Sequence, residues 1–176
     1  MKLTEIRTTP DGTYAGARFS AASRDAVEQY ITKHKIPNAP RMDSLHSTIL
    51  YSRKYLPDYV AKGPYDPAIK AQPVGFETWP SQPDESGHVK KCLVLTFDAP
   101  DLAARHESLM SQHEAEYDFD EYKPHVTFSY DIGDDVNPDR LPEFSEELEL
   151  TEEYSEILNT DWARSNTLKE RRDYKR

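Results

Sequence analysis

The chain has 176 residues, of which 31% are charged and 36% hydrophobic, and its formal net charge at pH 7 is −10. A chain of this length suits one domain that buries a substantial core. Its 22 Lys and Arg against 32 Asp and Glu argue against a protein that grips long RNA or DNA through a basic face.

The N-terminal residues, MKLTEIRTTPDG, lack the apolar segment of a secretory signal, and no window of the chain approaches a transmembrane span. Cys92 is alone, so the chain has no disulfide framework and no thiolate metal cluster. We therefore expect a soluble protein of a reducing cytoplasm, with no membrane contact.

The first predicted unit runs strand, helix, strand. Residues 13–20, TYAGARFS, are expected to form a strand. Ser23 is expected to cap a helix whose apolar residues recur with helical spacing: Val27, Tyr30, Ile31 and His34. The tripeptide NAP ends that pattern, and residues 45–51, LHSTILY, are the next strand.

The middle of the chain is less regular. Residues 53–72 carry three prolines and no sustained period, which predicts a long excursion with at most short structure. Residues 73–79, PVGFETW, are expected to be a strand. A turn segment, SQPDESG, then leads into the most apolar predicted strand, HVKKCLVLTFDA at residues 88–99.

The second unit repeats the order of the first. Pro100 suits the first position of a helix that fades near Tyr117, and residues 124–132, PHVTFSYDI, follow as a strand. Residues 144–150, FSEELEL, are expected to form a further strand. The duplication predicts an α+β protein of two lobes, with a mainly antiparallel sheet in each lobe, a central cleft and the helices outside.

Each unit ends in the same motif, His46-Ser47-Thr48-Ile49 in the first and His125-Val126-Thr127-Phe128 in the second. Side chains at i and i+2 of a strand share a face, so each histidine lies beside its threonine. Strict alternation places the other residues on the opposite face: Leu45, Ser47, Ile49 and Tyr51, and Val126, Phe128 and Tyr130.

Two imidazoles across a cleft are suited to proton transfer near neutral pH, one as base and one as acid. The two threonine hydroxyls can donate to the oxygens of a phosphate. Neither motif places a carboxylate near its histidine, so no metal ion is expected. One such motif arises often by chance, but two on strands with matching surroundings indicate a function.

The paired motifs and the duplicated layout resemble the 2H phosphoesterase superfamily. Within it, the chain is similar to the phage anti-CBASS phosphodiesterases, which destroy cyclic oligonucleotide messengers of bacterial immunity. The similar segments are TYAGARF, SLHSTILYS, ETWP, YKPHVTFSY and EYSEILNTDW. The resemblance implies catalysis by His46, Thr48, His125 and Thr127, with no metal or other cofactor.

The resemblance also implies that bases are contacted by Tyr14, Trp79, Glu156 and Trp162. Taken alone, Trp79 suits a core position equally well, and Glu156 suits a solvated one. Tyr122 and Lys123 flank the second motif, near the phosphate or at the rim. We place the domain at residues 1–162 and a basic tail at residues 163–176.

The implied substrates are 3′,5′-linked cyclic di- and trinucleotides, adenine-containing, in the cytoplasm of an infected bacterial host. Two alternatives stay open: an enzyme acting on 2′,3′-cyclic phosphates or RNA ends, and a non-catalytic protein that sequesters cyclic nucleotides. The sequence carries no signal of the oligomeric state.

Overall fold

The computed structural model describes residues 10–117, 119 and 121–159. The elements in chain order are β1 (Pro10–Phe19), α1 (Ala21–Lys33), β2 (His46–Ser52), β3 (Gly63–Pro80), β4 (Lys91–Asp98), α2 (Pro100–His113), β5 (His125–Ser129) and β6 (Leu148–Asn159). Short 3₁₀ helices form at Met42–Ser44 and Pro138–Arg140. Among the described residues, no helix is long and apolar enough to cross a membrane.

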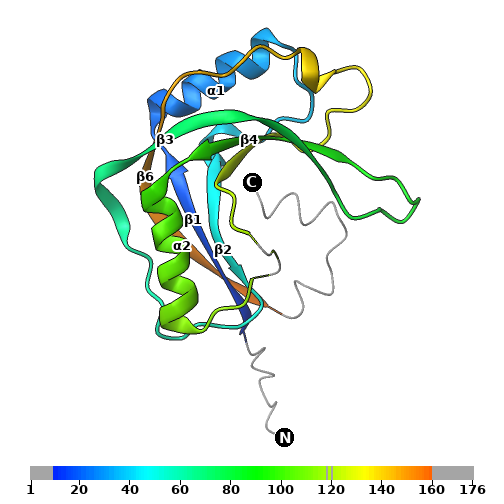
Figure 1. The fold of residues 1–176 in the computed structure, drawn as a ribbon. Coiled ribbons are helices and arrows are strands. Elements are labelled where there is room, and N and C mark those ends of the chain that lie inside the picture. Colours follow the sequence, from blue (N-terminus) through cyan, green and yellow to red (C-terminus); the bar gives the residue numbers. More distant parts are fainter. Residues whose placement is uncertain (1–9, 118, 120, 160–176) are drawn as a thin grey trace, which may run out of the picture.

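The strands form a six-stranded antiparallel sheet in the order β2-β1-β6-β3-β4-β5 (Figure 1). The long strand β3 pairs with β6 along residues 63–71 and with β4 along residues 72–80, so it joins the two halves. The units β1-α1-β2 and β4-α2-β5 build the outer parts of this sheet. The predicted α+β architecture with two lobes is therefore confirmed, and one continuous sheet connects the lobes.

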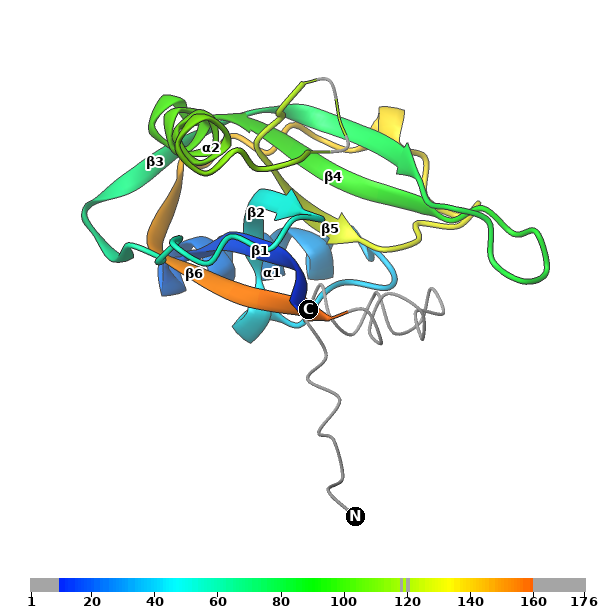
Figure 2. The same cartoon turned by 90° about the horizontal axis from the view of Figure 1, so that it is seen from below.

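The helices pack across the halves. Tyr30 of α1 contacts Phe76 of β3 and Phe128 of β5, with ring centroids 5.4 and 5.8 Å apart. His106 of α2 bonds the carbonyl oxygen of Ile49 in β2. The two edge strands, β2 and β5, lie beside one another when the sheet is seen from below (Figure 2), so the sheet is strongly curled but open.

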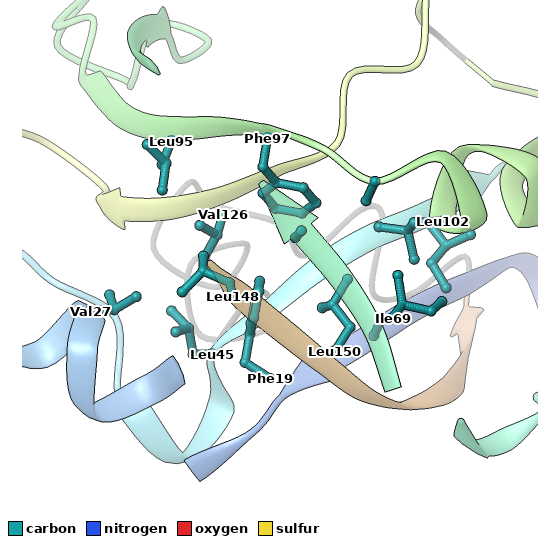
Figure 3. Close-up of a cluster of buried hydrophobic side chains, with 14 of the residues drawn as sticks. Phe19, Val27, Leu45, Ile69, Leu95, Phe97, Leu102, Val126, Leu148 and Leu150 are labelled. Carbon is teal, nitrogen blue, oxygen red and sulfur yellow. The ribbon is translucent and has the colours of Figure 1, made fainter. Parts of the chain in front are cut away.

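The buried face of the sheet carries the hydrophobic core, which both halves share (Figure 3). Phe19 of β1 and Phe97 of β4 meet edge to face, with centroids 6.2 Å apart. Leu148 and Leu150 of β6 are fully buried at alternate positions. Because strand side chains alternate, packing one face leaves the opposite face of the same strands for polar residues.

Several expected boundaries were wrong. The prediction of at most short structure across residues 53–72 missed the first half of β3, which is held by pairing with β6. The register of that pairing shifts between Pro64 and Ile69, where prolines cannot donate to the ladder. The last strand begins at Leu148 and runs on to Asn159, beyond the expected residues 144–150.

The cap of α1 was also misplaced. Ser20 is the N-cap, and its side chain accepts a hydrogen bond from the Ser23 amide at 3.1 Å. Ser23 is buried, and its hydroxyl accepts from the Glu149 amide at 2.8 Å, which ties the helix to β6. The second helix begins at Pro100 as expected but ends at His113, about a turn before Tyr117.

Candidate active site

Both HxT motifs line one pocket. His46 and Thr48 come from β2, and His125 and Thr127 come from β5, and among the described residues Pro40, Leu45 and Tyr130 also line the pocket. The motifs are far apart in the chain and lie on opposite edges of the sheet, and the curl of the sheet brings those edges together (Figure 2). All four side chains are half-buried, so they reach the pocket surface.

In both strands the residue after the motif threonine forms a β-bulge. The pairing of β2 with β1 skips Ile49, and the pairing of β5 with β4 skips Phe128. A bulge reverses the alternation beyond it. The prediction that Tyr51 and Tyr130 face away from the histidines was therefore wrong: Tyr51 meets Tyr14 edge-on, and Tyr130 lines the pocket.

The two histidines are held in the same way. Nδ1 of His46 lies 2.8 Å from the carbonyl oxygen of Ser44, and Nδ1 of His125 lies 2.8 Å from that of Lys123. A carbonyl oxygen only accepts, so in each ring the proton sits on Nδ1. When such a ring is neutral, its Nε2 is unprotonated, which is the form that removes a proton from a substrate hydroxyl.

Tyr14 positions the first threonine. Its hydroxyl lies 2.9 Å from Oγ1 of Thr48, and its ring is only 6% exposed, packed near His46 and Tyr154. The base contact that the resemblance implies for Tyr14 stays a prediction, because these contacts show only how its ring and hydroxyl are held. Burial, reinforced by the neighbouring Tyr154, raises the pKa of Tyr14 well above its usual value, so the phenol keeps its proton at neutral pH.

A stacked pair supports the backbone of the same motif. The Tyr122 hydroxyl donates to the Thr48 carbonyl at 2.8 Å, and its ring stacks on His106 with centroids 4.1 Å apart. Nδ1 of His106 lies 2.7 Å from the Ile49 carbonyl at the bulge. Burial lowers the pKa of His106, which favours a neutral ring. The pair thus holds two successive carbonyls of β2, and sequence spacing alone carries no signal of it.

Tyr154 is a further residue that sequence reasoning missed. Its ring lies 6.3 Å from that of His46, and the guanidinium of Arg18 lies 4.0 Å from its centroid. Arg18 also pairs with Glu152 at 3.2 Å. Gly16 leaves room for the ring, since a Cβ there would stand 2.8 Å from the Tyr154 phenol. The glycine in TYAGARF therefore permits a close approach of strand and aromatic ring.

The expected base contacts differ in their placement. Trp79 of β3 is half-buried, and its ring centroid lies 4.3 Å from that of His125 at a tilt of 58°. Glu156 is the register partner of Tyr14 on β6 and is half-buried. Trp162 lies outside the described residues, as do residues 163–176. The fold therefore places Trp79 against His125 of the second motif, and it places Glu156 opposite Tyr14 on the neighbouring strand.

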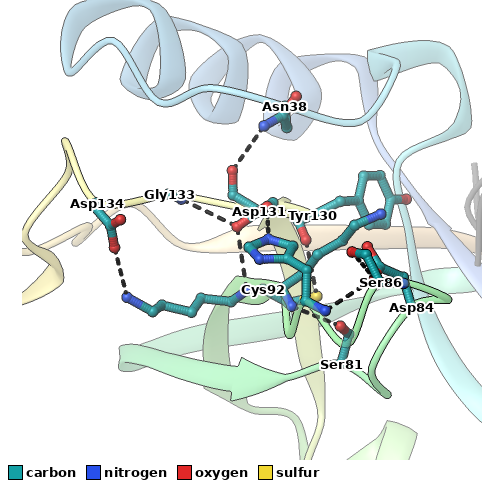
Figure 4. Close-up of polar contacts among 12 residues, drawn as sticks. Asn38, Ser81, Asp84, Ser86, Cys92, Tyr130, Asp131, Gly133 and Asp134 are labelled. Carbon is teal, nitrogen blue, oxygen red and sulfur yellow. Dashed lines mark hydrogen bonds and ion pairs between the residues drawn. The ribbon is translucent and has the colours of Figure 1, made fainter.

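Polar contacts brace the end of β5 behind Tyr130 (Figure 4). The Cys92 thiol donates to the Tyr130 carbonyl at 3.3 Å, and the Asn38 side chain donates to the Asp131 carbonyl at 2.8 Å. Burial alone would raise the pKa of Asp131, but bonds from the Gly133 and Lys91 amides outweigh it and lower the pKa. The pocket wall at Tyr130 is thus fixed from two sides.

Comparison with known proteins places the chain in a family. Residues 11–165 match the family model described as anti-CBASS protein Acb1. The chain is 34% identical over 153 residues to the anti-CBASS protein Acb1 of Yersinia phage phiR1-RT, across 87% of this chain and 92% of that protein. It is 32% identical over 165 residues to that of Enterobacteria phage T4, across 92% and 97%.

Solved structures share the fold at low sequence identity. A crystal structure of E. coli LigT complexed with phosphate aligns with a TM-score of 0.53 and 15% identity, over 84% of this chain and 87% of that one. E. coli LigT complexed with 3′-AMP gives 0.54 and 15%, over 85% and 88%. With two HxT strands lining one pocket of a 2H phosphoesterase fold, and a family match over most of its length, the chain belongs to the anti-CBASS protein Acb1 family.

Proposed function

We propose that this protein is a phosphodiesterase that cleaves 3′,5′-linked cyclic di- and trinucleotides, such as 3′,3′-cyclic GMP-AMP, without a metal ion. The observation that carries the proposal is the pocket itself: two imidazoles with Nδ1 engaged by backbone carbonyls, each beside a threonine hydroxyl. The family's counter-defence name supports cyclic oligonucleotide messengers as substrates and the cytoplasm of an infected bacterium as the place of action.

The reaction follows from two histidines in opposite protonation states. Nε2 of one takes the proton of a ribose 2′-hydroxyl, and the 2′-oxygen attacks the adjacent phosphorus. The bond from phosphorus to O5′ breaks, and the other histidine, protonated, gives its proton to O5′. The product is a linear nucleotide with a 2′,3′-cyclic phosphate. With the roles reversed, water opens that ring to a 3′-phosphate.

The threonines donate to the non-bridging oxygens, where negative charge grows in the transition state. A hydroxyl has only one proton to give, so Thr48 serves as donor only when it accepts from Tyr14. The Tyr14 phenol lies 2.9 Å away and keeps its proton, so it can act as the donor when Thr48 donates to the phosphate. Thr127 has the equivalent position in the second motif.

Base recognition falls to residues around the histidines. Trp79, against His125 and half-buried, is suited to stack on a base, a contact typically worth about 1–3 kcal/mol. Glu156 can accept from an exocyclic amine such as that of adenine, and we propose it as the adenine contact. Trp162 is proposed as a further base contact. A net charge of −10 favours a small stacked ligand over long RNA.

The test is incubation with 3′,3′-cyclic GMP-AMP, with and without EDTA, followed by liquid chromatography and mass spectrometry. The first product is an isomer of the substrate, so chromatography must resolve it, whereas the final product is heavier by one water. We expect the same rate in EDTA. His46→Ala and His125→Ala should each lose about 10²–10⁴-fold in rate, whereas His88→Ala, an exposed histidine outside the motifs, should be unaffected.

Each rival gives a different result. Tight binding of an unchanged nucleotide would identify a sequestering protein. Turnover confined to 2′,3′-cyclic phosphates or RNA ends would identify the other enzymatic class. Loss of activity in EDTA would overturn the metal-independent mechanism.

A further inference from the structure

The two motif strands are not neighbours in the sheet. β2 and β5 occupy its opposite edges. In the sheet, β2 pairs with β1 and β5 pairs with β4. Ladder bonds therefore fix each motif within its own half of the sheet. The spacing between the two motifs depends on contacts that cross from one edge to the other.

One short hydrogen bond joins the motifs directly. The hydroxyl of Ser47, the residue between His46 and Thr48, donates to the main-chain carbonyl of His125 at 2.7 Å. Ser47 is fully buried, on the opposite face of β2 from the pocket. The bond therefore connects the main chain of His125 to the side chain of Ser47, the residue that directly follows His46.

The chemistry of this position indicates that the bond, and not packing, accounts for the serine. Val126 occupies the same place in the second motif and is also fully buried, so an apolar side chain suits such a site. A buried hydroxyl costs free energy unless it is hydrogen-bonded. The hydrogen bond offsets this cost only while the His125 carbonyl oxygen lies within reach of the Ser47 hydroxyl. The bond therefore fixes where β5 lies relative to β2.

We propose that Ser47 is a positioning residue, whose bond to the His125 carbonyl sets the spacing of the two histidines. The proposal rests on the two-histidine phosphodiesterase reaction proposed above. Both proton transfers must reach one phosphate, so a small change in spacing impairs them together. Errors of about 1 Å in such placement can cost about 10²-fold in rate.

The experiment compares Ser47→Ala with a matched serine. Ser129 is also fully buried and donates to a main-chain carbonyl, that of Pro37, at 2.6 Å, but this bond does not link the motifs. We expect Ser47→Ala to lower kcat about 10- to 100-fold with little change in KM. Ser129→Ala should lower the melting temperature to a similar degree and leave kcat near the wild-type value.

Ser47→Cys provides a second variant if alanine does not fold. It exchanges one atom, and its thiol is a weaker donor with a longer bond, so kcat should fall between the wild-type and alanine values. A folded Ser47→Ala or Ser47→Cys protein with wild-type kcat would overturn the proposal. An equal fall of kcat in Ser129→Ala would do the same, because it would show general softening of the fold.

Failure of the parent proposal looks different. If wild-type protein cleaves no cyclic dinucleotide, or if His46→Ala keeps full activity, the two-histidine reaction itself is wrong. If wild type cleaves, the histidine variants do not, and Ser47→Ala matches wild type, only the positioning role is wrong.

Discussion

Replacing Arg105 with methionine tests a buried ion pair that holds several elements together. Glu153 of β6 is 2% exposed and accepts from Nε and Nη2 of Arg105 in α2 at 2.8 and 2.9 Å. It also accepts from the Tyr59 hydroxyl, the Lys62 amide and the Tyr65 hydroxyl at 3.0, 2.8 and 3.2 Å. One carboxylate thus joins α2, the segment before β3, and β3 itself to β6.

The expected loss of stability follows from the groups that remain buried after the substitution. Among the described residues, Arg105 is the one positive partner of Glu153 and makes two of the five hydrogen bonds to it, so Arg105→Met leaves a buried carboxylate without a counter-charge there. Breaking a buried pair from one side costs about 3–5 kcal/mol. Because three neutral donors remain, we expect a value near the lower end, about 3 kcal/mol, or roughly 6–12 °C in melting temperature.

Urea denaturation at pH 7 measures the effect, with Arg41→Met as the matched control. Arg41 pairs with Asp43 at 2.7 Å, but the two side chains are 70% and 65% exposed, so its loss should cost less than about 1 kcal/mol. Adding Glu153→Gln to Arg105→Met should recover part of the stability, because it removes the unpaired charge. If the two arginine variants lose equal stability, the reasoning is refuted.

Glu153 also predicts a pH dependence. Burial alone would raise its pKa, but the bonds from Arg105 and the Lys62 amide outweigh burial and hold the pKa below the usual 4.5. A carboxyl with a lowered folded-state pKa stabilises the fold above its unfolded-state pKa, and this contribution is lost as the pH falls through the folded value. The unfolding free energy of wild type should therefore decline below about pH 4.5 more steeply than that of Glu153→Gln.

Three further predictions concern the pocket. Thr48→Ala should lower kcat by about 10²–10³-fold in steady-state assays and change KM less, and a pure KM effect would show that Thr48 binds only the ground state. Tyr14→Phe keeps the buried ring but removes the bond to Thr48, so kcat should fall in wild type and stay unchanged in a Thr48→Ala background. Trp79→Ala should stay folded. When it is added to the inactive His46→Ala protein, calorimetry should show nucleotide binding weakened by about 1–3 kcal/mol relative to His46→Ala alone. Unchanged binding would show that Trp79 does not contact a base.

Short-range patterns were enough to predict much of this protein. The two HxT motifs stand in apolar, β-branched runs, and each follows a strand and a helix, so the duplicated α+β layout could be inferred. The shared face of His46 with Thr48, and of His125 with Thr127, follows from a period of two. These features depend only on residues close in the chain, which is why they are readable without the structure.

Other features depend on which strands meet and in what register. The first half of β3, with its prolines, is held as a strand by pairing with β6, whose residues lie some eighty positions away. The bulges at Ile49 and Phe128 exist only relative to β1 and β4, and they turn Tyr51 and Tyr130 to the pocket side. The alternation of residues within one strand does not depend on the register of its partner strand. It therefore predicts the wrong face for Tyr51 and Tyr130.

The polar groups that support the motifs are the clearest case. The Ser47 hydroxyl reaches His125, Tyr122 reaches the Thr48 carbonyl, and Tyr14 reaches its hydroxyl, each across a gap in sequence of at least 34 residues. A hydrogen bond needs its two atoms within about 3 Å, and only the curl of the whole sheet provides that proximity. Residue types and their local spacing therefore indicate which side chains are suited to the chemistry, whereas the long-range pairing of the strands sets which of those side chains meet.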